Sequence, residues 1–331
     1  FMAENTENIG LITLDSEILK VDNARNMIFK DIVFSGSRSN GVSFSKCQNV
    51  LLDGCTIENV GGQAFSLIND CTDCGIKNSM VNNVFNGVYL AQNGYVYNCE
   101  IKNFGGECYA RGISAMGNCS IKNNTIFGSD HLAMEVSGKK NIIEYNDISK
   151  VVSHTGDMGA IYYNCPDADG NIIRNNYFHD LHTRRKFDLS IRAIHLDNGT
   201  SGVTVENNYF ENIDGHGVVI NGGCNKVCSN VFKFVSAPIS ASQLGDLYSG
   251  IEISDNVSSD TTTISSNGLT LIGINAEEVI GYGTNLYTDE LNIFADFKNR
   301  DFSVISKPYG KLTNYKNFSI VGCGKQEVSA Q

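Results

Sequence analysis

Two acidic side chains lie next to short apolar stretches of similar pattern. Asp157 is in TGDMGAIYY (155–163), and Asp197 is in AIHLDNGTSG (193–202). Hydrolysis of a glycosidic bond needs two carboxyl groups, one protonated and one ionised, about 5–5.5 Å apart in retaining enzymes and about 6.5–9.5 Å apart in inverting ones. Asp157 and Asp197 are therefore the candidate catalytic pair, and Glu135 is a third candidate carboxyl group.

Histidine, tyrosine and arginine side chains gather in the same part of the chain. Five of the six histidines lie between residues 154 and 216, and the sixth is His131. This concentration favours a binding site over its alternative, a solvated polar loop. The residues expected to contact a substrate are Glu135, Tyr162, His195, His154, Arg192, Asn198 and His131.

A second possible chemistry is elimination from an acidic glycan by a lyase, which needs cations that neutralise a uronate. The segment CPDADG (165–170) has alternating Asp residues, but no Glu closes it at the spacing of a calcium loop. The basic run 184–186 and Arg192 could serve a lyase, although such a run is usually a solvated loop. These residues favour a hydrolase, for which no cofactor is expected, whereas a lyase would call for Ca²⁺.

Two cysteine pairs have a spacing that resembles that of zinc ligands, in CTDC (71–74) and CNKVC (224–228). In the repeat described next they lie about seven coils, or on the order of 30 Å, apart, so they cannot bind one tetrahedral ion. No metal site is therefore expected. The eleven cysteines are predicted to be reduced thiols that pack in the coils.

An internal repeat runs through most of the chain and would position these side chains. Segments such as IKNNTI (121–126) and IRNNYF (173–178) recur every 20–32 residues. The fourth position of successive copies is Ser79, Cys99, Asn124, Asn146, Asn176, Asn208, Asn230 and Asn256, after Ile32 and Cys55. Short strands, Gly at turns and only three prolines predict an all-β fold, a right-handed parallel β-helix of about ten coils with an inward ladder of Asn side chains.

A second set of apolar stretches lies between these copies, and each alternates like a strand with one buried face. It includes AMEV (133–136), AIYY (160–163), AIHL (193–196) and GVVI (217–220). Because equivalent positions on stacked coils form a column, we predict that Tyr162 and His195 point outward side by side. Glu135 and Val219 would occupy the coils on either side, and Asp197 would lie one outward step beyond His195.

The two longest copies of the repeat, of 30 and 32 residues, contain the candidate acids. A solenoid tolerates insertions on one face, and that face is often the binding face. Asp157 precedes its strand whereas Asp197 follows its strand, so straight strands would hold the two acids too far apart. Gly156 and Gly159 could bend Asp157 back over the same face.

Length and charge limit the remaining possibilities. A net charge of −11 over 331 residues argues against nucleic acid or an anionic membrane as partner, and no apolar stretch approaches the roughly 20 residues of a membrane span. We expect a lead-in at 1–25 that is the remainder of a truncated segment, a β-helix at 26–262, and end coils, a cap and a tail at 263–331. The first residues contain no signal peptide pattern, which leaves the compartment open.

The series NIIEYNDISKV (141–151), TGDMGAIYY, GNIIRNNYFHDL (170–181) and AIHLDNGTSGVTVENNYFENI (193–213) resembles the bacterial β-helix proteins of glycoside hydrolase family 141. That family has the elements T-x-D-x-G-A-[IF]-Y, G-N-x-I-R-x-N and L-D-D-x-x-S-G. The resemblance covers roughly residues 26 to 306. It implies a pectin-lyase-like β-helix that acts on plant-type polysaccharides as a fucosidase or xylanase, with catalytic carboxylates at Asp157 and Asp197.

The sequence departs from the family pattern at two points near the acids. Asn198 replaces the second Asp of L-D-D, and NCPDADG (164–170) stands where the family has Arg-Asp-Trp. Asn198, the absence of Trp and the expected truncated start favour a second hypothesis, a catalytically inactive β-helix that binds glycans or attaches to a surface. A polysaccharide lyase is the third hypothesis, and all three predict a polysaccharide or oligosaccharide partner.

Overall fold

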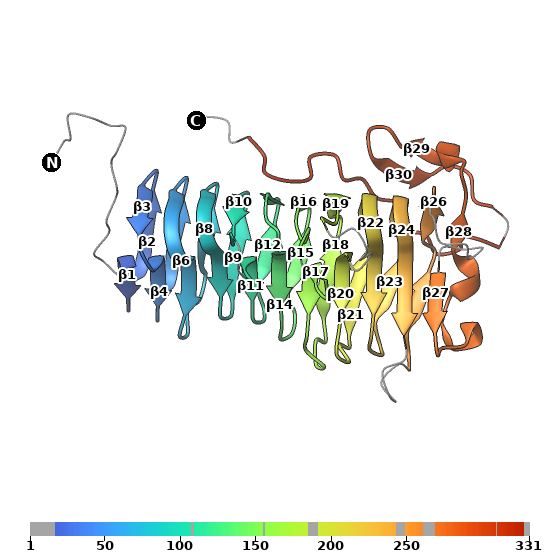
Figure 1. Ribbon diagram of the computed structural model, residues 1–331, viewed down its shortest axis with the longest axis horizontal. Coiled ribbons are helices and arrows are strands. Elements are labelled where there is room, and N and C mark those ends of the chain that lie inside the picture. Colours follow the sequence, from blue (N-terminus) through green and yellow to red (C-terminus); the bar gives the residue numbers. More distant parts are fainter. Residues whose placement is uncertain are drawn as a thin grey trace.

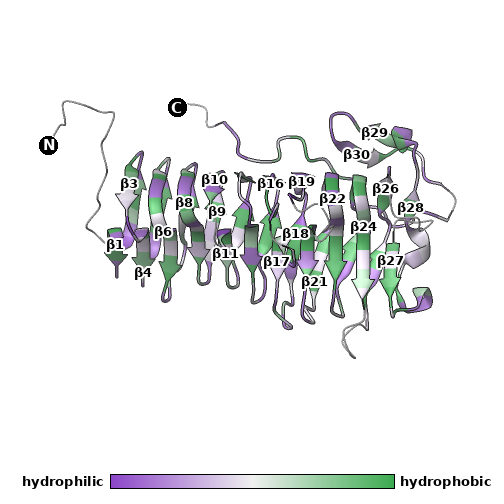
Figure 2. Ribbon diagram, viewed as in Figure 1, coloured by the Kyte–Doolittle hydropathy of each residue, from purple (hydrophilic) through white to green (hydrophobic). Residues whose placement is uncertain are grey.

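The computed structural model describes residues 17–106, 109–154, 156–184, 191–242, 249–260, 269–308 and 310–327. The chain is a right-handed parallel β-helix of about ten coils with almost no helix, as predicted (Figure 1). Each coil contributes strands to three parallel columns, and equivalent strands pair in register along the solenoid. Hydrophobic and hydrophilic segments alternate along the strands (Figure 2).

One column forms a separate sheet, called here the back sheet. Its strands are β2 (Arg25–Lys30), β5 (Gln48–Asp53), β7 (Cys74–Lys77), β9 (Gly94–Tyr97), β12 (Ser120–Lys122), β15 (Ile142–Glu144), β18 (Asn171–Arg174), β21 (Val203–Glu206), β23 (Lys226–Cys228) and β25 (Glu252–Ser254). A sharp turn then leads into the second column.

The second column, called here the ladder column, contains β3 (Val33–Ser37), β10 (Glu100–Phe104), β13 (Thr125–Phe127), β16 (Asp147–Ser149), β19 (Tyr177–Leu181), β26 (Val257–Ser259) and β28 (Leu286–Tyr287). The third column, called here the site column, contains β1 (Glu17–Asp22), β4 (Asn40–Ser45), β11 (Arg111–Ala115), β14 (Leu132–Val136), β17 (Gly159–Tyr163), β20 (Arg192–Leu196) and β27 (Leu269–Ile272). Four long strands pass through both columns, namely β6 (Thr56–Ile68), β8 (Met80–Leu90), β22 (Tyr209–Ile220) and β24 (Val231–Ser242).

The interior is apolar because alternate residues of every strand point inward. In the back sheet, Ile143 lies opposite Ile121 and Ile173 on the neighbouring coils, and all three are fully buried. In the ladder column, the ring of Phe210 stacks between Phe178 and Phe232, at centroid distances of 4.9 and 4.6 Å. Stacking of like residues on successive coils therefore builds one continuous core.

The Asn ladder fills the turn between the back sheet and the ladder column, as predicted. The backbone N–H and the Nδ2 group of Asn146 both donate to Oδ1 of Asn176, each over 2.9 Å. Asn176 donates in the same way to Asn208, and both side chains are fully buried. These bonds satisfy polar groups that would otherwise be unpaired inside the coil.

The solenoid pattern continues beyond residue 262, where the repeat is no longer visible in the sequence. Asn285 extends the ladder by one coil, because Nδ2 of Asn256 donates to its Oδ1 over 2.9 Å. At the other end, β1 already pairs with β4 although it precedes residue 26. The last coil also contains the short 3₁₀ helices η2 (Ala276–Glu278) and η3 (Tyr282–Thr284).

The C-terminal part folds back along the outside of the solenoid (Figure 1). It begins with η4 (Leu291–Ile293) and the antiparallel pair β29 (Phe294–Asp296) and β30 (Asp301–Val304). Residues 310–327, called here the strap, then cross successive coils at the ladder turn. Their backbone N–H groups bond to Thr284, Asp255, Ser229, Tyr145, Thr125 and Asn98 in turn.

The described cysteines are free thiols, and most of them are buried in the coils. No helix in the described part of the chain is long and apolar enough to cross a membrane.

Candidate functional site

The outward row of the site column has the register that the sequence predicts. Tyr162 lies opposite Glu135 on one side and His195 on the other, and His195 lies opposite Val219. Tyr162 and His195 do not belong to the apolar core, although both are buried. Their rings contact each other at a centroid distance of 5.5 Å.

Asp197 follows β20 and accepts hydrogen bonds from two neighbouring coils. The Tyr162 hydroxyl donates to Oδ2 over 2.9 Å, and Nδ2 of Asn221 donates to Oδ1 over 3.0 Å. Burial alone would raise the pKa of Asp197, but the hydrogen bonds from the Asn221 amide, the Asn198 backbone and the Tyr162 hydroxyl together lower it. Asp197 is therefore an ionised carboxylate at neutral pH.

Asn221 connects Asp197 to His195 and to a further coil. One of its amide hydrogens points to Asp197, and the same Nδ2 lies 3.2 Å from Nε2 of His195. The Ser242 hydroxyl donates to Oδ1 of Asn221 over 2.5 Å, which fixes the orientation of the amide. Ser242, Asn221 and Asp197 thus form a hydrogen-bonded row across three coils.

His195 is held in its neutral form. Burial lowers the pKa of its imidazole, the positive charge of Arg192 lowers it further, and Asp197, at 3.4 Å from Nε2, acts in the opposite direction. Nε2 of His195 faces both the Asn221 amide, at 3.2 Å, and the Asp197 carboxylate, at 3.4 Å. His195 is therefore a positioning group beside Asp197 rather than a cation.

The turn before β17 brings Asp157 near the same strands. Gly156 and Asp157 form this turn, and β17 begins at Gly159. Oδ1 of Asp157 lies 3.3 Å from Nη1 of Arg192, the first residue of β20. Burial, the hydrogen bond to Asp197 and the charges of Asp197 and Asp157 raise the pKa of the Tyr162 hydroxyl.

The two acids differ strongly in exposure. The side chain of Asp157 is 83% exposed, whereas that of Asp197 is 14% exposed. Asp157 is therefore free to change partners when a ligand binds, while Asp197 is fixed by its neighbours.

A cavity of about 530 Å³ adjoins this cluster on the outer face of the site column. Asn221 and Ser242 line it and so connect it to Asp197. Arg192 and His216 add polar groups, and Val219, Ala237 and Ile272 add apolar ones. A cavity with an apolar wall and a few fixed polar groups is typical of a small-ligand or sugar site.

Two residues expected at the site have other partners. Glu135 forms an ion pair with Arg111, whose guanidinium also lies over the ring of Tyr109 at 4.6 Å. Asn198 is exposed, and its side chain donates to Oδ1 of Asn164 over 3.2 Å and so lies beside the Asp197 cluster rather than in it.

His131 and His154 lie at the bend between the ladder column and the site column. His131 is buried, and burial lowers the pKa of its imidazole. His154 is exposed, and its backbone N–H donates to the Asp130 carbonyl over 3.3 Å. Neither residue lines the cavity beside Asp197.

The two charged segments that could serve a lyase form ion pairs with other side chains. In CPDADG, Oδ1 of Asp167 pairs with Nζ of Lys139 over 2.7 Å. Arg184 pairs with Asp130 over 3.1 Å, and residues 185 and 186 lie outside the described residues. Within the described ranges, no group of three or more His, Cys, Asp or Glu side chains could hold a metal ion.

Asn221, Ser242 and Arg111 were not among the residues expected at the site. A sequence signal for the first two exists, because Asn221 follows GVVI and Ser242 follows PISA just as Asp197 follows AIHL. The pairing of β20 with β22 and of β22 with β24 puts these three positions in one row.

Several solved β-helices are similar in backbone shape. An alginate lyase has 14% identity and a TM-score of 0.45, over 76% of this chain and 57% of that one. The catalytic domain of an α-1,3-glucanase has 12% identity and a TM-score of 0.46, over 73% and 54%. The tailspike protein of E. coli bacteriophage HK620, as a double mutant, has 14% identity and a TM-score of 0.43, over 75% and 60%.

This chain thus spans less than two thirds of the length of each of those three proteins. No curated protein matches it significantly in sequence. Residues 111–293, more than half of the chain, match the family model described as a right-handed β-helix region. The chain therefore belongs to the right-handed β-helix family.

Proposed function

We propose that this chain is a carbohydrate-active enzyme that hydrolyses glycosidic bonds on the outer face of its site column. One observation carries the proposal. Asp197 is kept ionised by hydrogen bonds from Tyr162 and Asn221, and Asn221 also lines the neighbouring cavity of about 530 Å³. A fixed carboxylate beside a partly apolar cavity fits the needs of glycoside hydrolysis.

In this proposal, Asp197 is the ionised group of the carboxyl pair. It either removes a proton from the attacking water or attacks the anomeric carbon, depending on its distance from the proton donor. Tyr162 and Asn221 hold both oxygens of Asp197, so the carboxylate does not need to reorient during the reaction.

Asp157 is the proposed proton donor to the leaving oxygen. Its ion pair with Arg192 must loosen for this role, which its 83% exposure allows. A sugar hydroxyl that bonds to Arg192 would release Asp157 over the substrate. The proposed substrates are plant-type polysaccharides, with fucosylated glycans and xylan first, because of the resemblance described above.

A glycan-binding protein without turnover is the second candidate. The observation that favours it is the ion pair between Asp157 and Arg192, because it engages the carboxyl group that is proposed as the proton donor. Asn198 does not distinguish the two candidates, since its side chain bonds to Asn164 and is not part of the Asp197 cluster.

Product analysis with matched variants tests the proposal. The chain would be incubated with fucosylated, xylan and pectic glycans, together with alginate and α-1,3-glucan, and new reducing ends would be measured. Asp157→Asn should lose turnover and keep its melting temperature, Asp197→Asn should lose turnover and remain folded, and Asp167→Asn, an exposed acid paired with Lys139, should keep both turnover and melting temperature. Unsaturated products would identify a lyase, and binding without any product would identify the second candidate.

A further inference from the structure

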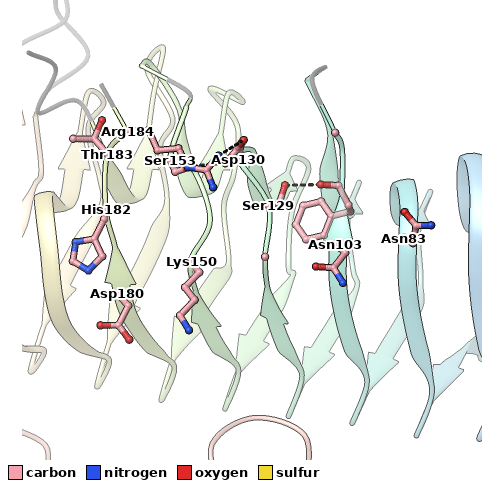
Figure 3. Close-up of a pocket in the computed structure, with 13 residues that line it drawn as sticks. Asn83, Asn103, Ser129, Asp130, Lys150, Ser153, Asp180, His182, Thr183 and Arg184 are labelled. Carbon is pink, nitrogen blue, oxygen red and sulfur yellow. Dashed lines mark hydrogen bonds and ion pairs between the residues drawn. The ribbon is translucent and has the colours of Figure 1, made fainter. Parts of the chain in front are cut away.

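A second cavity, of about 640 Å³, lies on the bend between the ladder column and the site column (Figure 3). One residue from each of five successive coils lines its length, namely Asn83, Asn103, Gly128, Lys150 and Asp180. We call this cavity the bend groove. None of its lining residues lines the cavity beside Asp197.

These five residues repeat with the period of the solenoid. Each has a positive φ, between 50° and 75°, because each occupies the same turn of its coil. Coils stack about 4.8 Å apart, so the row runs for roughly 19 Å along the solenoid axis. The bend groove is therefore long enough for several sugar rings in an extended chain.

The charges that line the bend groove balance, because Asp130 and Asp180 are acidic and Lys150 and Arg184 are basic. Arg184 pairs with Asp130, which also accepts a bond from Ser153. Asp180 pairs with His179 over 2.9 Å, and His182 pairs with Asp214 over 3.0 Å. A groove whose charges are balanced in this way attracts neither anions nor cations strongly.

Hydrogen-bonding groups nevertheless remain available along the row. Nδ2 of Asn83 bonds to Asn59, and Nδ2 of Asn103 bonds to Asn82, which directs both amides across the coils. Lys150 has no ion-pair partner among the described residues, and Figure 3 shows it between Asp180 and the Ser129 coil. Amides and an ammonium group at coil spacing can bond to hydroxyl groups that repeat along a chain.

We propose that the bend groove is a second binding site that holds a neutral glycan chain along the solenoid axis. It is separate from the Asp197 site and takes no part in bond cleavage. The choice of a glycan as ligand rests on the proposed function, whereas the site itself rests on the row of residues.

Calorimetry with a non-cleaving variant tests the inference. Asp197→Asn protein would be titrated with neutral xylo-oligosaccharides and fucosylated oligosaccharides, and with galacturonic acid oligomers, of two and six units. Lys150→Asn in this background should weaken binding of a neutral six-unit chain about tenfold, the value of one charged hydrogen bond. Lys46→Asn is the matched control, because Lys46 is also exposed with a positive φ but lies on another turn.

Three results would contradict the second binding site. Equal affinities for Lys150→Asn and Lys46→Asn, preferred binding of the acidic oligomers, or no binding of any chain by folded protein would overturn it. Failure of the proposed function would give a different result. If the chain cleaves no glycan but Lys150→Asn still weakens glycan binding, the bend groove remains a binding site. Cleavage of a two-unit substrate should be unchanged in Lys150→Asn with Asp197 intact.

Discussion

The Tyr162 hydroxyl donates a 2.9 Å hydrogen bond to Oδ2 of Asp197, although 35 residues separate them in the chain. Stacking of β17 on β20 creates this contact, because Tyr162 lies opposite His195 and Asp197 is the next outward residue after His195. The fold thus brings the hydroxyl and the carboxylate together through strand register alone.

Replacing Tyr162 by Phe should move the acid limb of the activity profile to higher pH. The hydrogen bond from Tyr162 contributes to the lowered pKa of Asp197, so its loss raises that pKa and leaves less of the carboxylate ionised in acid. We expect kcat/KM below pH 5 to fall roughly tenfold, with a smaller loss at pH 7. A pH–rate profile identical to that of the unmodified chain would contradict the role of Tyr162.

Replacing Ser242 by Ala should lower kcat/KM, because Ser242 lines the cavity and orients Asn221. Ser242 does not contact Asp197, but it orients the Asn221 amide that does. Loss of one hydrogen bond of this kind costs about 1 kcal/mol, or roughly fivefold in rate. Asn221→Ala should have a larger effect, because it removes the bond to Asp197 itself.

Ser137→Ala is the matched control for these two variants. Ser137 lies in the same outward row, where it contacts Met116 and not the Asp197 cluster. Equal losses in Ser137→Ala and Ser242→Ala would show that the row acts through general stability and not through Asn221.

The unfolding free energy should depend on pH through His195. Burial lowers the pKa of the folded imidazole below its ordinary value near 6.5. Below pH 6.5 the unfolded chain therefore binds a proton at His195 that the folded chain does not bind. The free energy of unfolding falls as the pH falls toward the pKa of the folded imidazole. Urea titrations at pH 7.0 and 5.5 should show this loss, at most about 1.4 kcal/mol per pH unit.

His195→Gln isolates that contribution, because all other titrating groups are retained. The variant should lose less stability than the unmodified chain between the two pH values. An equal loss in both proteins would mean that His195 does not titrate in this window.

Removing one rung of the ladder should destabilise the solenoid severely. Asn176 accepts two bonds from Asn146 and donates to Asn208 and to the Ile143 carbonyl. Asn176→Ala leaves several buried polar groups unpaired, so we expect a loss of at least about 3 kcal/mol in chemical denaturation. Asn49→Gly, which removes an exposed Asn pair with Asn26, should cost far less.

The sequence was sufficient for the parts of the structure that depend on strict periodicity. The ladder positions from Asn124 to Asn256 and the outward placement of Tyr162 and His195 follow from a fixed number of residues per strand. Asn285 was not predicted, because the surrounding residues of that coil no longer match the repeat.

The positions that could not be predicted lie where backbone geometry varies from coil to coil. Asn221 follows β22 and Ser242 ends β24, where polar residues commonly lead into turns, so their type alone did not indicate a role. His131 and His154 were expected near Asp197, yet the bend between the columns separates them from its cavity. Loop length gives the number of residues in such a bend but not the direction of its side chains.

The strap could not be predicted from the repeat either, since it lies outside the coils and binds them through backbone N–H groups and buried side chains such as Phe318 and Ile320. Its attachment begins at a second apolar cluster, in which the fully buried ring of Phe302 contacts Tyr209 at 4.9 Å and Phe318 at 4.9 Å. Phe302→Ala should therefore cost about 3–5 kcal/mol of unfolding free energy if the strap and the solenoid unfold together.

Limited proteolysis separates this outcome from local release of the strap. If the strap detaches on its own, Phe302→Ala should become sensitive to cleavage within residues 310–327 while the solenoid keeps its melting temperature. Ile305→Ala is the control, because Ile305 is 69% exposed and its loss should change stability by less than about 0.5 kcal/mol. An unchanged cleavage pattern and melting temperature in Phe302→Ala would show that this aromatic cluster does not anchor the strap.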